Sequence, residues 1–560
     1  MRRTPRAVVC VLLALALAGC AGLPTSGSVQ AGESATSSED EPSFDFRPDG
    51  PQTDASPEQI VDGFITAASS PEGTSADGSW AIARSFLATD YRADWNPQAS
   101  VVVDVFADRQ YTVADDGTVS VQVTPVATVD DAGTYTPTEG GTITLTYRLA
   151  QQEDGQWRIV DAPAGLLMDE DLFASVFHSY EVMYFDPTWT YLVPDVRWFP
   201  TVNAVGRIAT ALVNGTPASW LAASVVTAFP AGVTLTPAVP VSGGVAQAEL
   251  SDEALSADDL TLKRMQTQLS ASLATAGVTS VQMLVDGSAI DASTVTTAST
   301  KVDATRPLVL GDAGFGFLSS GTVTTITGLS DAVVALAPSA IETAADLQSA
   351  AVLAGGSAVR VLADGSTTVV DSRAGVLAPT IDPSGNIWSV PSGTPSAVQA
   401  TTTAGTVIAI AGAWSGATAI GAMQVSRDGT RMAAVVSYGS TTVLAVAGVI
   451  RDTDGTPSAL GEPVVLAQLP DGGVDVGWLD DASVGVVSAG TTSMFLDAPV
   501  GGAGDTLSVP VSAVSLAGTN SEDSVRLLGA DGSLYMRRSS TWVEVASGVT
   551  VLAVQQGSPG

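Results

Sequence analysis

The chain has 560 residues, and its 58 acidic side chains against 23 basic ones give a formal net charge of −35 at pH 7. A chain this acidic repels phosphate backbones, which argues against nucleic acid as a partner. Both cysteines, Cys10 and Cys20, lie near the N-terminus, so the remainder of the chain has no possible disulfide. The length predicts about three or four domains.

Residues 1–19 have the features of a secretory signal peptide. A basic start, Met1–Arg6, precedes an apolar run from Ala7 to Ala18. That run is too short to cross the ~30 Å hydrocarbon core of a bilayer as a mature helix, so a signal peptide fits better than a membrane span. No later stretch contains the ~18 consecutive apolar residues that a transmembrane helix requires.

The apolar run ends in Leu17-Ala18-Gly19-Cys20, which resembles the lipobox of bacterial lipoproteins. The resemblance implies cleavage between Gly19 and Cys20, a diacylglyceryl group on the Cys20 sulfur and a palmitoyl group on its new amino terminus. Two or three acyl chains hold a protein stably on a bilayer. We therefore expect a lipid anchor at Cys20 on the extracytoplasmic face of the plasma membrane; the alternative is an ordinary signal peptide with an incidental cysteine.

Residues 20–55 predict a flexible tether, because Gly, Ser, Thr, Pro and acidic residues leave too little apolar surface to fold. An α+β domain is expected over residues 56–165. Ser56 and Gln59 predict a capping box at the start of a helix, and a short second helix should follow near residues 80–87. Strands are expected at 101–106, 119–126, 142–149 and 157–160. Helices followed by this meander resemble the NTF2-like cone fold, either packed solid or holding a pocket.

Residues 169–292 predict a second, α/β domain. Asn203 is the expected cap of one helix and Ser256 that of another, since apolar residues follow each at helical spacing. Residues 280–285 predict a strand that ends at Asp286-Gly287.

The second domain also carries a specific family resemblance. Its segments are similar to the GerMN domain of the LpqB family of actinobacterial lipoproteins. The resemblance implies a membrane lipoprotein that is accessory to a two-component system in cell-envelope and division signalling. It further implies binding to the extracytoplasmic sensor domain of a histidine kinase like MtrB, and it brings no catalytic residues. The matching segments are Val182–Pro187, Leu192–Pro200, Ala211–Pro217, Thr227–Gly232 and Gly243–Ala246.

Residues 303–556 consist of short apolar segments separated by Gly, Asp and Ser turns, with weak internal repeats. Ile381-Asp382-Pro383-Ser384-Gly385 matches Val425-Ser426-Arg427-Asp428-Gly429, 44 residues later. This spacing is typical of propeller blades, and ring closure would protect the strand edges. We expect an all-β propeller of about six blades; a stack of β-sandwiches is the competing architecture.

The sequence predicts no catalytic, metal or cofactor site. His178 is the single histidine, so the usual catalytic triads lack their base and zinc lacks its normal ligands. Two carboxylate pairs suggest glycoside hydrolysis, but adjacent acids in turns and caps more often face water. A third segment is similar to a calcium loop, although a β-turn explains it better. These candidates are Asp130-Asp131, Asp258-Asp259 and Asp452-Thr453-Asp454-Gly455.

Three functions remain open at this point. The first is a non-enzymatic regulator that docks on a membrane sensor kinase. The second is a lipoprotein that binds cell-wall carbohydrate or peptidoglycan, with Trp189 and Trp198 as stacking platforms; the competing interpretation places both rings in the core. The third is a cell-wall hydrolase, for which the sequence offers no catalytic motif.

Overall fold

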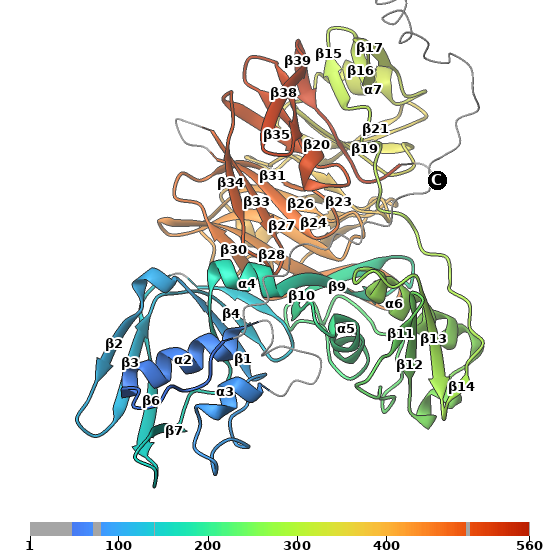
Figure 1. The fold of residues 1–560 in the computed structure, drawn as a ribbon. Coiled ribbons are helices and arrows are strands. Elements are labelled where there is room, and N and C mark those ends of the chain that lie inside the picture. Colours follow the sequence, from blue (N-terminus) through green and yellow to red (C-terminus); the bar gives the residue numbers. More distant parts are fainter. Residues whose placement is uncertain (1–47, 71–79, 139, 489–492, 559–560) are drawn as a thin grey trace, which may run out of the picture. The chain divides into compact units, whose positions relative to one another are not determined.

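The computed structural model describes residues 48–70, 80–138, 140–488 and 493–558. Arg47–Gly560 form one compact unit, mostly of β-strands with a few helices (Figure 1). The predicted signal peptide, the cleavage site at Gly19, and Cys20 lie outside the described residues. Within the part that is described, we find no helix with the length and apolar character needed to cross a bilayer.

The first described helix, α2 (Pro57–Ser69), begins as predicted. Ser56 Oγ accepts the N–H of Gln59 at 3.3 Å, and Gln59 Oε1 accepts the N–H of Ser56 at 2.9 Å, which completes the capping box. Its apolar face, which includes Ile60 and Phe64, is buried. The second helix, α3 (Ala81–Ser85), is shorter than the expected span, because left-handed Trp80 precedes it and the chain leaves it at Phe86.

The N-terminal strands form two four-stranded sheets, which corrects the predicted meander. The expected strand 119–126 is two strands in different sheets, broken before Pro125, whose nitrogen cannot donate a hydrogen bond. Strands β2, β5 and β8 were missed, and β8 pairs parallel with β1. One sheet is β5 (Tyr135–Pro137), β4 (Pro125–Asp130), β1 (Ser100–Asp104) and β8 (Leu166–Asp169); the other is β2 (Gln110–Val113), β3 (Thr118–Val123), β6 (Ile143–Gln151) and β7 (Trp157–Asp161).

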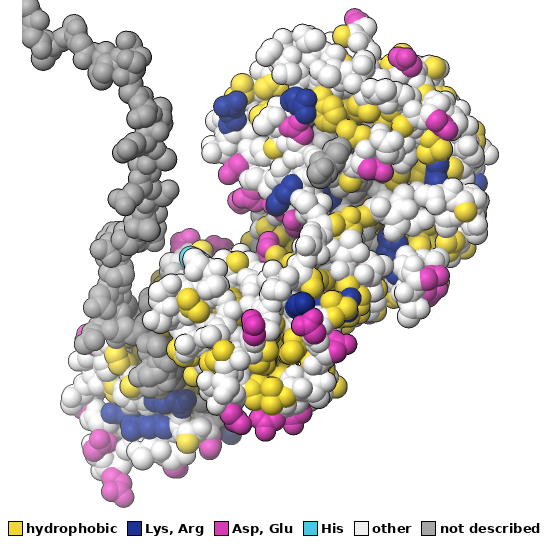
Figure 2. Space-filling view, turned by 90° about the vertical axis from the view of Figure 1, so that its right-hand side faces the viewer, with side chains coloured by type: hydrophobic (Ala, Val, Ile, Leu, Met, Phe, Trp, Pro, Cys, Tyr) yellow, Lys and Arg dark blue, Asp and Glu magenta, His cyan; other side chains and the backbone are white. Residues whose placement is uncertain are grey.

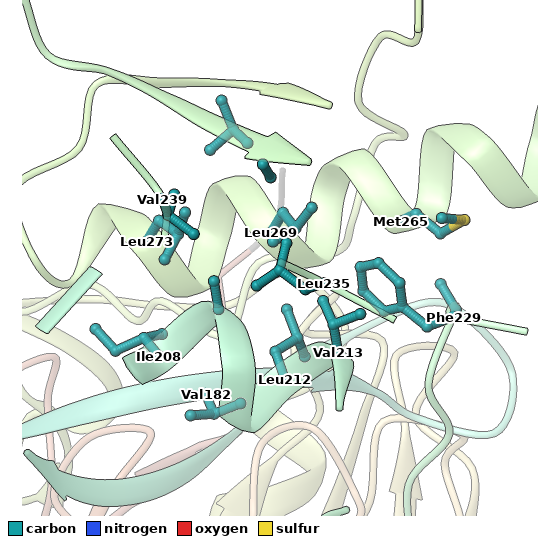
Figure 3. Close-up of a cluster of buried hydrophobic side chains, with 14 of the residues drawn as sticks. Val182, Ile208, Leu212, Val213, Phe229, Leu235, Val239, Met265, Leu269 and Leu273 are labelled. Atoms are coloured by element: carbon teal, nitrogen blue, oxygen red, sulfur yellow. The ribbon is translucent and has the colours of Figure 1, made fainter. Parts of the chain in front are cut away.

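The middle region begins with α4 (Glu170–Val176) and a long hairpin of β9 (Phe177–Phe185) and β10 (Leu192–Pro200). Helices α5 (Ala204–Val213) and α6 (Asp259–Ala274) bury their apolar faces against each other and against this hairpin; Figure 3 shows Leu212 of α5 and Leu269 of α6 in that core. A four-stranded sheet completes the region, with the order β11 (Val241–Ser242), β12 (Val245–Glu249), β13 (Ser280–Val285) and β14 (Ser288–Ala289).

Of the two helix caps predicted for this region, Asn203 does stand at the N-cap of α5, whereas Ser256 is not the N-cap of α6. Ser256 ends a short 3₁₀ helix (Asp252–Ser256), and Asp258 caps α6 by accepting the N–H of Thr261 at 2.7 Å. Asn203 does precede α5, but its backbone is left-handed (φ 62°) and its side chain caps nothing. The turn predicted after the strand 280–285 is present, since Asp286 and Gly287 both have positive φ.

In the C-terminal region, the described strands from 308 to 555 form six successive sheets. The first sheet contains β15 (Leu308–Gly311), β16 (Gly314–Ser319), β17 (Thr322–Thr324) and β39 (Val549–Leu552), and the second contains β18 (Ala340–Thr343), β19 (Ser349–Ala354), β20 (Ser357–Leu362), β21 (Thr367–Asp371) and β40 (Val554–Gln555). The third contains β22 (Thr380–Ile381), β23 (Ile387–Ser389), β24 (Gln399–Thr401) and β25 (Val407–Ala409), and the fourth contains β26 (Ala419–Val425), β27 (Arg431–Tyr438), β28 (Thr441–Arg451), β29 (Pro457–Leu460) and β30 (Val464–Gln468). The fifth contains β31 (Gly473–Trp478), β32 (Ser483–Ser488), β33 (Met494–Pro499) and β34 (Asp505–Ser508), and the sixth contains β35 (Ala513–Ala517), β36 (Arg526–Gly529), β37 (Leu534–Arg538) and β38 (Thr541–Ala546).

Six strands, one from each sheet, form a closed circuit. In order they are β39, β18, β22, β26, β31 and β35, and each packs against the next, with β35 returning to β39. Strand β39, near the end of the chain, completes the first sheet by pairing antiparallel with β15. This propeller-like arrangement ties the start of the region to its end and protects the inner edges of the sheets.

A buried ion pair holds β10 to its surroundings. Arg197 donates to Asp195 at 2.7 Å, and the two side chains are 4% and 3% exposed. The remaining acceptors of Arg197 are Ala132 O, Thr134 Oγ1 and Thr216 O, at 3.0–3.2 Å. Burial acts to lower the pKa of Arg197, but the charge and the hydrogen bond of Asp195 raise it by more.

A polar network lies among the circuit strands. Buried Glu342 on β18 accepts hydrogen bonds from Thr380, Ile381, Gln424 and Gln556. Burial raises the pKa of Glu342 despite these bonds. Asp475 on β31 accepts the N–H of Leu516 at 2.9 Å, and burial raises its pKa to about 7, with the charge of Glu342 as a smaller cause.

Replacing Arg197 by Met should destabilise the protein by about 3–5 kcal/mol, because it leaves the Asp195 carboxylate buried without its counter-charge. The free energy of unfolding in urea measures this loss. Arg148→Met is the matched control: Arg148 is 70% exposed and 4.0 Å from Asp161, so its loss should change stability by no more than about 0.5 kcal/mol. Equal effects of the two substitutions would contradict the role given to the buried pair.

Asp475→Asn should flatten the pH dependence of stability between about pH 4 and pH 7. The folded protein keeps the Asp475 proton up to a pKa of about 7, whereas the unfolded chain releases it near pH 4. Stability from this group is therefore full below pH 4 and is lost as the pH rises toward 7, at about 1.4 kcal/mol per pH unit.

Thermal unfolding across this pH range tests the Asp475 prediction. Asp364→Asn is the control, since hydrogen bonds from Ser366 lower the pKa of exposed Asp364 and confine its influence to more acidic conditions. A wild-type slope retained in Asp475→Asn would show that other groups carry the pH dependence.

Candidate interaction groove

A groove of about 690 Å³ lies where the three regions meet; we call it the junction groove. It is lined by segments from β5, from β10 and the loop that follows α5, from β30, and from the turn after β33. The lining residues are Thr134–Thr138, Asp195, Val196, Ala218, Trp220, Pro463–Gln468 and Val500–Gly502.

Strand β5 contributes an unpaired edge to the groove. It is the terminal strand of its sheet and pairs only with β4. The preceding turn is held by Asp130, whose Oδ1 accepts the N–H groups of Ala132 at 3.0 Å and Thr134 at 2.7 Å. In an antiparallel strand paired on one side, alternate backbone groups point away from the partner. Part of the β5 backbone is therefore available for a further strand.

Strand β30 contributes a second edge. It pairs only with β28, in a register that shifts next to Leu444. Every residue of β30 lines the groove, and Val465 is 41% exposed. Such a bulge bends an edge strand and discourages indiscriminate pairing. The groove thus combines two strand edges with an apolar lining.

The groove has little means of catalysis. Besides the Tyr135 phenol, Asp195 is the one ionisable side chain in its lining, and Arg197 and the N–H of Ala218 already occupy that carboxylate. Unpaired strand edges with apolar pockets between them are the features that bind an extended peptide by β-strand addition. The geometry therefore favours recognition of a polypeptide.

Trp198 and Trp189, the candidate stacking platforms, are engaged within the protein. The Trp198 ring donates to Gly501 O at 2.7 Å and packs against Tyr135 and Phe173. The Arg264 guanidinium lies 4.0 Å from the centre of the Trp189 ring and covers one face of it. Neither ring is presented as a bare platform for a sugar.

The other candidate residues stay apart. His178 is exposed on β9, and Asp130 ends β4, with Asp131 in the turn that leads to β5. Asp258 caps α6, whereas Asp259 forms an exposed ion pair with Lys263 at 2.7 Å.

The segment similar to a calcium loop is a β-turn, as expected. The N–H of Gly455 donates to Asp452 O at 2.9 Å, and Gly455 has a φ of 84°. Among the residues that the structure describes, no three His, Cys, Asp or Glu side chains group as a metal site would require.

The sequence did not point to the junction groove. Strand β5 has three residues, and β30 follows β29 after a short Pro463-containing link, so neither shows a clear period of two. The one local signal was Asp130 and Asp131 before Gly133, which marks a turn and hence a strand on each side.

Comparison with protein families agrees with this architecture. Residues 50–174 match the model "Lipoprotein LpqB, N-terminal domain", and residues 315–553 match the "Lipoprotein LpqB beta-propeller domain". Between them, residues 181–291 match the Germane family, described as "Sporulation and spore germination". The two LpqB models together match more than half of the chain.

Curated relatives carry the same name. A Lipoprotein LpqB of Cutibacterium acnes is 31% identical over 270 residues, which cover 46% of this chain and 44% of that protein. The Thermobifida fusca protein of that name is 32% identical over 282 residues, covering 48% of this chain and 44% of its own length. The aligned stretch thus spans less than half the length of either relative.

Among solved structures, a chain of a nidogen/laminin complex is 12% identical, with a TM-score of 0.34, over 44% of this chain and 97% of that one. A likeness this distant carries no argument about function. The two LpqB domain models match the N-terminal and the C-terminal regions of this fold, in that order. The chain therefore belongs to the LpqB family of lipoproteins, with a propeller-like C-terminal domain.

Proposed function

We propose that this protein is a lipid-anchored regulator on the extracytoplasmic face of the plasma membrane. It binds the sensor domain of a two-component histidine kinase, of the MtrB kind, and influences cell-envelope and division signalling. The observation that carries the proposal is the junction groove, where the edges of β5 and β30 flank a mainly apolar lining whose one carboxylate, Asp195, is already paired. Such a surface recognises polypeptide and performs no chemistry of its own.

The anchor in this proposal is Cys20. The curated relatives are named lipoproteins, and the lipobox-like segment ends at Cys20. Residues 1–19 would be removed, and the residues from Cys20 to Phe46 would tether the folded body. The expected tether boundary at 55 is too late, because Ala55 packs against the N-terminal core and the N–H of Asp54 donates to Gln156 Oε1 at 2.7 Å. A flexible tether of about 27 residues spans roughly 25–30 Å, enough to let that body reach a neighbouring receptor.

The proposal keeps three domains, an NTF2-like α+β domain expected at 56–165, a GerMN-like domain at 169–292 and a six-bladed propeller at 303–556. The first must extend past residue 165, because β8 (Leu166–Asp169) pairs with β1 in its sheet. Six sheets joined in a closed circuit support the blade number.

Regulation by docking needs differential affinity. A bound partner shifts a kinase between two states only by the difference in its binding free energy for each state. Shifting such an equilibrium tenfold requires about 1.4 kcal/mol of that difference. One added strand with a side chain in an apolar pocket can supply a difference of this size.

Val465→Arg should weaken binding to the purified kinase sensor domain roughly tenfold or more, because it places a charge on the apolar wall of the groove. Surface plasmon resonance with the full-length protein measures the affinity. The control is Val407→Arg on β25, since Val407 is 55% exposed and lies outside the groove. Undetectable binding of the unmodified protein at high micromolar concentration, or equal losses in both variants, would contradict the proposal.

Cys20→Ser should abolish labelling of the protein by radioactive palmitate and release it from the membrane fraction, because serine offers no thiol for the diacylglyceryl group. Mass spectrometry of the native amino terminus provides the direct measurement. An unacylated amino terminus in the wild-type protein would exclude the lipid anchor, whatever the outcome for the groove.

A further inference from the structure

A second cleft, of about 480 Å³, lies beside α5 and is separate from the junction groove. Its lining includes Gln98, Asp131, Asn203, Arg207 and Thr210. No residue lines both the cleft and the groove. The volume is within the range of sites that bind small molecules. We call this the Arg207 cleft.

Helix α5 presents one face to the cleft and the other to the core. Asn203, Arg207 and Thr210 recur at intervals of three and four residues, which places them on one side of the helix. Ile208 and Leu212 point to the opposite side, into the core shown in Figure 3. The helix is therefore fixed by packing, and Arg207 is carried on a rigid element.

Arg207 has no partner for its charge. Within the described residues it forms no ion pair or side-chain hydrogen bond, and its Nε is buried without an acceptor. Burial alone lowers the pKa of its guanidinium, and no nearby acid offsets that effect. An unpaired, partly buried cation is costly unless something else supplies the negative charge.

Arg197, in the wall of the same cleft, shows the contrast. Its guanidinium has Asp195 and three further acceptors, although its Nε is also buried without one, so its charge is paired within the fold. The side chains of Gln98 and Thr210 make no hydrogen bond within the described residues, whereas Asn214 is occupied by the backbone of Leu235. The cleft thus holds one free cation beside several free polar groups.

The balance of charge favours a carboxylate. The lining has one unpaired cation and one exposed acid, Asp131. A phosphate monoester carries about −1.5 to −2 at pH 7 and needs more positive charge than this cleft offers. A single carboxylate matches the planar fork of one arginine, and amide groups suit the free hydrogen-bonding side chains.

We propose that the Arg207 cleft binds a small ligand of the peptide class through its carboxylate. The carboxylate pairs with Arg207, and Gln98 and Thr210 hold the neighbouring amide groups. Asp131 at the cleft disfavours ligands with a second negative charge. The cleft and the groove share no lining residue, so substitutions at Arg207 and at Val465 test peptide binding and kinase docking separately.

The test is isothermal titration of the full-length protein with N-acetyl-alanyl-alanine, its C-terminal amide and inorganic phosphate. The free-carboxylate dipeptide should bind, and the amide and phosphate should each bind at least tenfold more weakly. Arg207→Gln should weaken dipeptide binding roughly 10- to 100-fold, the loss expected for a charge-assisted pair. Arg148→Gln, at a mostly exposed arginine, should leave dipeptide binding unchanged.

A second measurement separates binding from folding. Because Arg207→Gln removes an unpaired charge, the ligand-free variant should melt at the same temperature as the wild type or higher. A clearly lower melting temperature would make Arg207 a structural residue and overturn the proposal. So would the absence of dipeptide binding at about 10 mM, tighter binding of phosphate, or unchanged binding in Arg207→Gln.

Discussion

The ion pair between Asp195 and Arg197 connects the junction groove with the Arg207 cleft. Asp195 lines the junction groove, and Arg197, two residues later on β10, lines the Arg207 cleft. Arg197 also binds the turn before β5 through Ala132 and Thr134. A buried pair of this kind need not add stability over apolar residues, but it fixes register strongly, because any shift leaves charges unpaired. It holds both the turn before β5 and, through Thr216 and Ala218, the loop that follows α5.

Arg197 of this pair and Arg207 on α5 differ in what their buried charges contact. Arg197 is more buried but has every acceptor that it needs, apart from one at its Nε, whereas Arg207 has none. On the face drawn in Figure 2, acidic side chains are scattered widely among fewer basic ones. The chain has 58 acidic and 23 basic residues. With acids in such excess, the lack of an acidic partner for Arg207 is unexpected.

Local signals in the sequence predicted local structure well. The capping box at Ser56, the Asp286-Gly287 turn and the propeller-like repeats depend on residues close together in the chain, and all are present. Strands β5 and β8 were missed because each is short and gains its stability from a partner strand distant in sequence. Ser256 failed as a cap because Asp258, two residues later, offers a carboxylate, which is favoured at a helix N-terminus. Cys20 came from the sequence alone, and Arg207 could not, since its lack of a partner is visible only in three dimensions.

The closed circuit of strands explains why the proposed binding at the junction groove would depend on the partner's conformation. Strand β39 returns to the first sheet, and β30 belongs to a sheet whose first strand, β26, is held in the circuit between β22 and β31. An added strand on β30 therefore meets a wall that cannot swing away to suit a poorly matched partner. Rigid edges make binding energy depend on the partner's conformation, because the mismatch is borne by the partner. A regulator of the proposed kind can bias a receptor only through such a difference, and a rigid groove would supply it.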